Sequence, residues 1–130
     1  MTIKQLIAAF ICILSPIQAL SSDSECIAVA IYKEASGEGL LGERSILDVI
    51  QQRMKDRHKT ACQVIKEPGQ FSWNTSSISA TKKQLTRYRF VSSIPPVVKG
   101  ARYFHNRKIS KPKWARKMPV KAVIGNHVFY

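Results

Sequence analysis

The chain has 130 residues and a net charge of +13, which allows one domain with one modest hydrophobic core. All eight acidic residues lie within positions 1–67, whereas positions 68–130 carry thirteen Lys and Arg residues and no acid. This distribution excludes a catalytic carboxylate from the second half. It favours an anionic polymer as that half's partner, either nucleic acid, acidic lipid or acidic cell-envelope polysaccharide.

The first 21 positions have the pattern of a secretory signal. Lys4 is the only charge before Asp23, an apolar run covers positions 6–14, and Pro16 and small residues around position 20 follow. We therefore expect a signal over 1–21, a single domain over 22–130, and a secreted or periplasmic location. The apolar run is short for a membrane span. An uncleaved membrane anchor is the alternative, and it is the one way in which we expect the protein to contact a membrane. Nucleic acid is then not the expected partner.

The first predicted helix of the domain ends at an acidic residue on its apolar face. One stripe, at i, i+3, i+4 and i+7, holds Ile27, Ala30, Ile31 and Glu34. Gly37 follows and ends the helix. A carboxyl group at such a boundary is partly desolvated, which raises its pKa and suits a general acid. The alternative is a surface glutamate that happens to fall on this side of the helix.

Two cysteines remain in the domain once Cys12 is assigned to the signal. Cys26 begins the Glu34 helix and Cys62 lies 36 positions later. In an exported domain an even count predicts a disulfide, worth about 3–4 kcal/mol by loop entropy. Two buried free thiols are the alternative.

Two more helices are predicted before the turn at positions 68–69. The first covers about positions 43–55 and has an apolar face made of Ile46, Leu47, Ile50 and Met54. The second is short, over 61–66, with Thr60 as its N-cap and Cys62 directed inward.

A basic helix is predicted over 81–91, with Leu85, Tyr88 and Val91 facing the core. Pro95 and Pro96 then stop regular structure. Positions 97–103 are expected to form a short helix or strand.

The C-terminal part of the chain predicts a small sheet. Positions 120–124 and 127–130 are β-prone runs around the Gly125–Asn126 pair, which is a hairpin signal. Positions 103–106 add a third strand. The fold class expected is therefore α+β, a mainly helical body with a short antiparallel sheet.

A series of short motifs runs in order through positions 26–130. They are Cys-Ile-Ala-Val-Ala-Ile-Tyr-Lys-Glu-Ala-Ser-Gly-Glu, Thr-Ala-Cys-Gln-Val-Ile, Gln-Phe-Ser-Trp, Ala-Arg-Tyr-Phe-His-Asn, Pro-Lys-Trp-Ala and Ile-Gly-Asn-His-Val-Phe-Tyr. Each is weakly specific, but in register they resemble the cell-wall hydrolase family that includes spore cortex-lytic enzymes. The resemblance implies a reduced lysozyme-like domain that cleaves peptidoglycan between N-acetylmuramic acid and N-acetylglucosamine.

The resemblance also assigns roles to residues. The family's catalytic acid, the first Glu of a Glu-Ala-Arg-Gly-Glu motif, falls on Glu34, and Ser36 replaces the motif's Arg. By residue type, as polar side chains that can orient sugar hydroxyls or rings that can stack on sugars, the residues expected to bind the glycan are Glu38, Gln70, Phe71, Trp73, Tyr103, His105, Trp114, Asn126 and His127. For each of these, a purely structural role is the alternative. No cofactor or metal is implied, and we expect a monomer whose partners are peptidoglycan and anionic envelope polymers.

The small number of acidic residues near Glu34 favours a lytic transglycosylase over a glycoside hydrolase. A glycoside hydrolase commonly uses two carboxylates, and only Glu38 and Glu43 lie near Glu34 in sequence. A lytic transglycosylase needs one, because the muramyl 6-hydroxyl attacks its own anomeric carbon. Two other classes remain. A zinc amidase that cuts the peptide side chain would need metal ligands, and His58, His105 and His127 form no close-spaced pair. A non-enzymatic cationic envelope-binding protein would need the basic surface alone.

Overall fold

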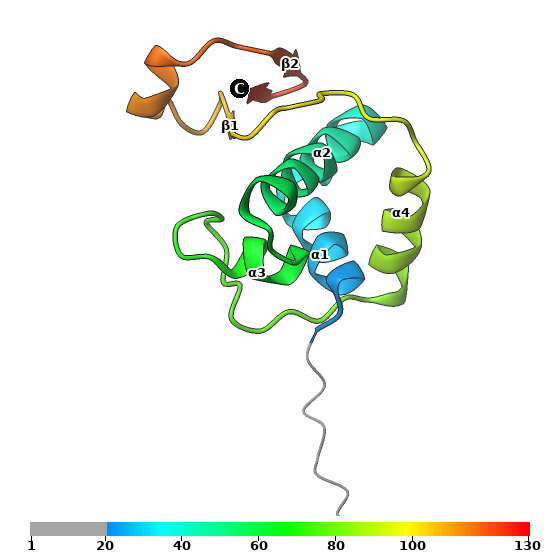
Figure 1. Ribbon diagram of the computed structural model, residues 1–130. Helices are drawn as coiled ribbons and strands as arrows, with labels where there is room; N and C mark the ends of the chain where they lie inside the picture. Colours follow the sequence, from blue (N-terminus) through cyan, green and yellow to red (C-terminus); the bar gives the residue numbers. More distant parts are fainter. Residues whose placement is uncertain (1–20) are drawn as a thin grey trace, which may run out of the picture.

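The computed structural model describes residues 21–130, so the predicted signal over 1–21 lies almost entirely outside the described residues. Four helices form one body, and a three-stranded antiparallel sheet lies at one end of it (Figure 1). The expected fold class, a helical body with a C-terminal sheet, is confirmed.

Helix α1, Asp23–Ala35, begins with a capping box. The Ser22 side chain accepts from the Glu25 backbone N–H, and the Glu25 carboxylate accepts from the Ser22 N–H in return. The helix ends as predicted, because Gly37 has a φ of +87° that continues no helix. The stripe of Ile27, Ala30 and Ile31 is buried. Glu34 therefore lies on the last turn of a helix whose face is in the core.

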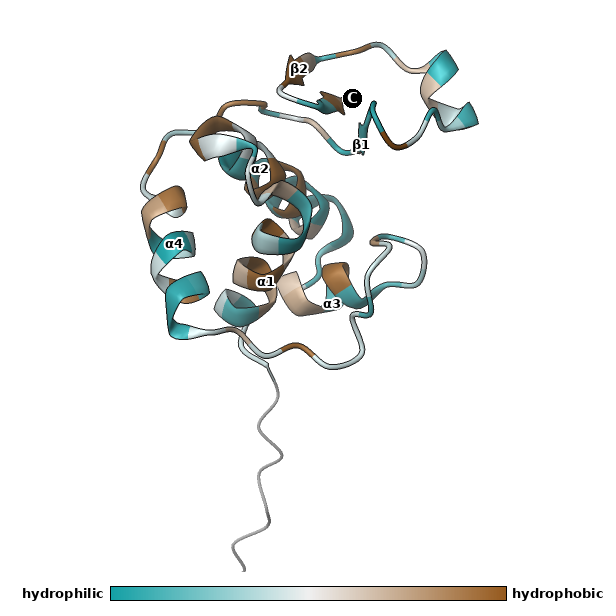
Figure 2. Cartoon of the chain, turned by 180° about the vertical axis from the view of Figure 1, so that it is seen from behind, coloured by the Kyte–Doolittle hydropathy of each residue, from teal (hydrophilic) through white to brown (hydrophobic). Residues whose placement is uncertain are grey.

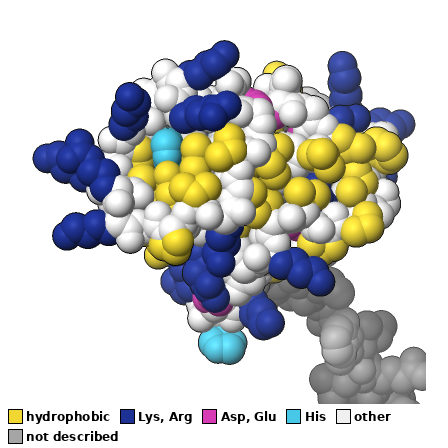
Figure 3. Space-filling view, turned by 90° about the horizontal axis from the view of Figure 1, so that it is seen from above, with side chains coloured by type: hydrophobic (Ala, Val, Ile, Leu, Met, Phe, Trp, Pro, Cys, Tyr) yellow, Lys and Arg dark blue, Asp and Glu magenta, His cyan; other side chains and the backbone are white. Residues whose placement is uncertain are grey.

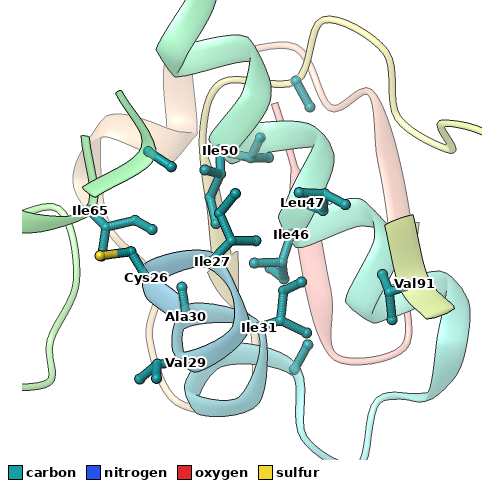
Figure 4. Close-up of a cluster of buried hydrophobic side chains, with 14 of the residues drawn as sticks. Cys26, Ile27, Val29, Ala30, Ile31, Ile46, Leu47, Ile50, Ile65 and Val91 are labelled. Atoms are coloured by element: carbon teal, nitrogen blue, oxygen red, sulfur yellow. The ribbon is translucent and has the colours of Figure 1, made fainter. Parts of the chain in front are cut away.

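Helix α2, Gly39–Arg57, begins four residues earlier than expected. Its Ile46, Leu47 and Ile50 are fully buried against α1. Figure 4 shows these side chains meeting Ile27 and Ile31 in the centre of the core. Burying side chains of this size contributes about 1.5–3 kcal/mol each, so the α1–α2 contact fixes the helix that carries Glu34.

Helix α3, Ala61–Lys66, matches its predicted bounds, with Thr60 in a capping box. The Cys26–Cys62 disulfide is present and joins the start of α1 to α3. The predicted pairing is therefore confirmed. α3 and α4 flank α1 on opposite sides, as the views from front and back both show (Figures 1 and 2).

Helix α4, Lys82–Ser92, follows the N-cap Thr81. Only Val91 of this helix is fully buried, while Leu85 and Tyr88 are partly buried. Most of α4 is hydrophilic along its length (Figure 2). Only a few apolar side chains of α4 therefore pack against α1 and α2.

The expectation of a short helix or strand over 97–103 is wrong. Residues 97–100 form bends and a turn, and residues 101–103 have no regular structure before β1 begins. The backbone N–H groups of Val97 and Val98 donate to the buried Asp48 carboxylate at 2.7 and 2.8 Å, and the Arg102 carbonyl accepts from Arg53. Because side chains of α2 occupy these backbone groups, they are not available for a helix or a strand ladder.

Strands β1, Phe104–Asn106, β2, Ala122–Ile124, and β3, His127–Phe129, pair in the order β1-β3-β2. The hairpin of β2 and β3 turns at Gly125–Asn126 as predicted, and Val123 pairs with Val128. Between β1 and β2 a 3₁₀-helix, Lys113–Lys117, was not predicted. Strand alternation directs Phe104 toward the helical core, while its neighbour His105 contacts the aromatic residues of the other face.

Among residues 21–130, no helix is both long and apolar enough to span a bilayer.

Candidate active site

The Glu34 carboxyl group is half-buried where α1 meets the loop that follows α3. Its Oε1 accepts a hydrogen bond of 3.1 Å from the indole N–H of Trp73. The Trp73 ring lies 5.7 Å from the ring of Phe71, which lies 6.4 Å from that of Phe104 on β1. An aromatic wall therefore runs from the catalytic candidate to the sheet.

Burial is the main influence on Glu34 and raises the pKa of its carboxyl group. The Trp73 hydrogen bond and the positive charge of Arg53 both act in the other direction and limit the rise in pKa. A carboxyl group in this environment keeps its proton at a higher pH than an exposed glutamate does. It has the property that a general acid needs.

Arg53 is a buried cation beside this wall. It is 5% exposed, and its Nε donates to the Arg102 carbonyl at 2.8 Å. Its guanidinium carbon lies 5.8 Å from the ring centre of Phe71, 5.9 Å from Tyr103 and 6.0 Å from Phe104. Arg53 thus ties α2 to the loop and the sheet by cation–π contact.

A second aromatic group lies on the other side of the sheet. The rings of Tyr103 and Trp114 are 5.7 Å apart, and Trp114 lies 5.3 Å from Tyr130. His105 stacks on Tyr130, with its Nε2 2.9 Å from the Tyr130 hydroxyl oxygen. Tyr103 and Trp114 are 40% and 43% exposed, so part of each side chain is open to solvent.

The structure places the other predicted residues against protein partners. The side-chain oxygen of Gln70 accepts from Arg57 at 3.4 Å. Asn126 donates to Glu38 twice, from its backbone N–H at 3.1 Å and from its side chain at 3.2 Å. His127 is 2% exposed, with Nδ1 3.9 Å from Glu38.

Glu38 therefore forms a clamp on the hairpin, four residues after Glu34. Gly125 has a φ of +57°, and a Cβ there would meet the Glu38 carboxylate, so the turn favours a glycine. Burial lowers the pKa of His127, while the Glu38 charge opposes this shift. The His127 ring is consequently neutral near pH 7, and its contact with Glu38 is not an ion pair.

Of the predicted site residues, the structure brings Glu34, Phe71 and Trp73 together, and it connects Tyr103 to them through Arg53. Sequence reasoning missed Arg53 and Phe104. A signal for Arg53 was present, because Ile46, Ile50 and Arg53 fall at i, i+4 and i+7 of the α2 face. This pattern is the same as the one that singled out Glu34.

Within the part of the chain that the structure describes, no cluster of three or more His, Cys, Asp or Glu side chains is arranged to hold a metal ion.

A family model for cell wall hydrolases matches residues 37–130. The chain belongs to the cell wall hydrolase family. The family match begins three residues after Glu34, so it does not include the candidate acid.

Two solved structures resemble this cell wall hydrolase. The catalytic domain of the germination-specific lytic transglycosylase SleB from Bacillus anthracis is 24% identical, with a TM-score of 0.68 over 88% of this chain and 98% of that domain. The catalytic domain of SleB from Bacillus cereus is 25% identical, also with a TM-score of 0.68, over 82% of this chain and 88% of that one. The lysozyme-like fold is therefore confirmed. Comparison with curated proteins gives no match.

Proposed function

We propose that this cell wall hydrolase is a lytic transglycosylase that cleaves peptidoglycan between N-acetylmuramic acid and N-acetylglucosamine, with Glu34 as its one catalytic carboxyl group. The proposal rests mainly on which acidic side chains the fold leaves available for catalysis. The seven other acids all lie in the described residues, and each accepts a hydrogen bond from a protein N–H group: Asp23, Glu25, Glu38, Glu43, Asp48, Asp56 and Glu67.

These contacts engage the acids in the structure of the domain. Asp48 holds two backbone N–H groups and pairs with Arg44, while Glu43 pairs with Arg87. Glu38, the nearest acid to Glu34 along the chain, is held by the hairpin clamp. Glu34 accepts one hydrogen bond among residues 21–130, from Trp73, and burial raises the pKa of its carboxyl group. A mechanism with one carboxyl group fits this arrangement better than one with two.

The reaction needs Glu34 twice. Its protonated form gives a proton to the glycosidic oxygen as the bond to the muramyl anomeric carbon breaks. The resulting carboxylate then takes the proton of the muramyl 6-hydroxyl as that oxygen attacks the anomeric carbon. The bond broken is replaced by an intramolecular one, and Glu34 regains its proton. Phe71 and Trp73 provide aromatic surface beside the acid, and Tyr103 and Trp114 are proposed to stack on sugars farther along the strand.

The substrate lies outside the cytoplasm, and we propose that the protein is exported to the envelope. The Cys26–Cys62 disulfide supports export, because such bonds persist in oxidising compartments. The basic half is proposed to hold anionic envelope polymers.

Mass spectrometry of digested peptidoglycan tests the reaction. The expected products carry 1,6-anhydromuramyl ends and are lighter by one water than hydrolysis products. If only reducing muramic ends are found, the intramolecular step is wrong but glycan cleavage stands. Free L-alanine amino termini would instead indicate an amidase.

A further inference from the structure

A groove of about 1170 Å³ lies between α1 and α4, on the side of α1 away from α3. Its apolar walls come from both helices and include Ala28, Ile31, Tyr32, Tyr88 and Phe90. Two of these rings are well exposed, Tyr32 at 51% and Phe90 at 53%. The groove is therefore open to a ligand that carries apolar groups.

The charged residues of this groove leave an excess of positive charge. Arg87 binds Glu43, the one acid among the lining residues, with Nε and Nη2 at 3.0 and 2.6 Å. Lys82 and Lys83 are exposed, and neither pairs with an acid among residues 21–130. Both lie in the first turn of α4, where the helix dipole is positive and a cation is unfavourable. An anion bound here relieves that repulsion.

The groove opens at the same end of α1 as the catalytic residue. Ser36 and Gly37, the two residues after the helix, line it. Trp73 contacts Glu34 from the loop after α3, so the acid and the groove lie on different sides of the end of α1. Lys82 and Lys83 lie near the other end of α1, since the Ala80 N–H just before them donates to Glu25. A side branch of a glycan held at Glu34 would therefore pass around the end of the helix and run along the groove to reach them.

We propose that the α1–α4 groove binds the short acidic peptide that branches from the glycan of the substrate, with its carboxylates at Lys82 and Lys83 and its alanine methyl groups on the apolar walls. Peptidoglycan peptides combine small apolar side chains with free carboxylates, which is the chemistry of this groove. The inference rests on the proposed function, since it names a second part of the same substrate.

The test compares two soluble substrates, glycan strands with their peptides and the same strands with the peptides removed. The measured quantity is the ratio of kcat/KM on the two. We expect a ratio of about five to ten for the parent protein, the effect of two partly exposed ion pairs plus apolar contact. Replacing both lysines, Lys82→Glu with Lys83→Glu, should bring the ratio to about one.

A control pair matches the change in charge. Lys108→Glu with Lys111→Glu alters the exposed loop after β1 by the same four charges, and we expect this variant to keep the parental ratio. A parental ratio near one, or equal ratios in the two double variants, would overturn the proposal.

Binding measured without cleavage separates this inference from the proposed function. The free acidic peptide, titrated by NMR, should shift the ring signals of Tyr32 and Phe90 in the parent but not in the Lys82/Lys83 variant. If neither glycan is cleaved, the proposed function fails while this titration still decides the groove. No shift with the peptide, together with binding to anionic lipid vesicles that needs the same lysines, would assign the groove to lipid and contradict the peptide.

Discussion

Burial and one indole hydrogen bond act in opposite directions on the Glu34 carboxyl group. Burial raises its pKa, while the Trp73 N–H stabilises the carboxylate and lowers it. The Arg53 charge also favours the carboxylate. These opposing influences suit the proposed mechanism, in which Glu34 keeps a proton before cleavage and accepts one afterwards.

Trp73→Phe tests this balance at the residue scale. The substitution keeps an aromatic ring but removes the N–H donor, so we expect the pKa of Glu34 to rise further. Because the acid must be protonated, the alkaline limb of the pH profile of kcat/KM should move to higher pH. A shift of this limb to lower pH would show that the indole acts on Glu34 mainly by excluding water.

At the scale of elements, the Glu38 clamp connects a loop of the helical body to the β2–β3 hairpin. It joins the β2–β3 turn to the loop between α1 and α2, close to the acid in sequence. Hydrogen bonds to a charged group contribute about 1.5–3 kcal/mol, enough to fix a hairpin made of two short strands. The clamp thereby sets the position of the sheet, including Phe104, against the helical body.

Glu38→Ala and Asn126→Ala should behave as changes to one unit. Each is expected to speed amide hydrogen exchange in β2 and β3 and to lower activity less than loss of Glu34 does. The double variant should lose less than the sum of the two single changes, with a coupling of about 0.5–3 kcal/mol in stability. If Glu38→Ala instead abolished activity while exchange in the hairpin stayed slow, Glu38 would be a second catalytic carboxylate.

Local signals explain why most helices and the hairpin could be predicted. Thr60 caps α3 with its own side chain, and the Gly125–Asn126 pair sets the turn, so both follow from adjacent residues. The structure of positions 97–103 could not be predicted, because the Asp48 carboxylate that binds this backbone comes from α2, about 50 residues earlier.

The candidate site also has residues that local sequence signals predict and residues whose roles depend on distant contacts. Glu34 was found because helical periodicity and a following glycine are local features. The hairpin partner of Glu38 and the aromatic contacts of Arg53 depend on how distant elements pack. Residue type alone therefore grouped Asn126 and His127 with the glycan-binding residues, whereas the structure places both against Glu38.

Charge is the dominant feature of the whole molecule. Figure 3 shows Lys and Arg side chains around the edge of one face, with apolar side chains across its middle. Positions 68–130 hold thirteen cations and no acid, and two of these cations, Arg87 and Arg102, form ion pairs with acids of α2. Such a surface suits retention on an insoluble anionic substrate.

The salt dependence of wall binding tests whether the basic surface retains the protein on its substrate. Exposed charges are screened over about 8–10 Å at 0.10–0.15 M salt. Binding to intact walls, measured by sedimentation, should weaken steeply as salt rises, while cleavage of short soluble glycans without peptides should change little. Wall binding that is indifferent to salt would leave these charges as a solvated surface with no role in retention.

The Glu34→Gln variant needs a control for folding. The raised pKa of Glu34 predicts how the Tm of this variant compares with that of the parent at different pH values. Burial penalises the ionised form of Glu34, so the parent protein carries this penalty at pH values above the raised pKa, and it disappears below the ordinary pKa of glutamate. Gln is neutral at every pH. The variant should therefore have a Tm at or above that of the parent at pH 7, and the two Tm values should converge at acid pH.

The rate at which Glu34→Gln clears purified peptidoglycan tests the central claim most directly. Gln keeps the shape of the side chain and an oxygen for the Trp73 hydrogen bond but has no proton to give. We predict a loss of about 100-fold or more, the range for a missing general acid, with Tm preserved. Glu38→Gln, the matched change four residues away, should lose far less. Clearance by Glu34→Gln at the parental rate would contradict the assignment of Glu34 as the catalytic acid.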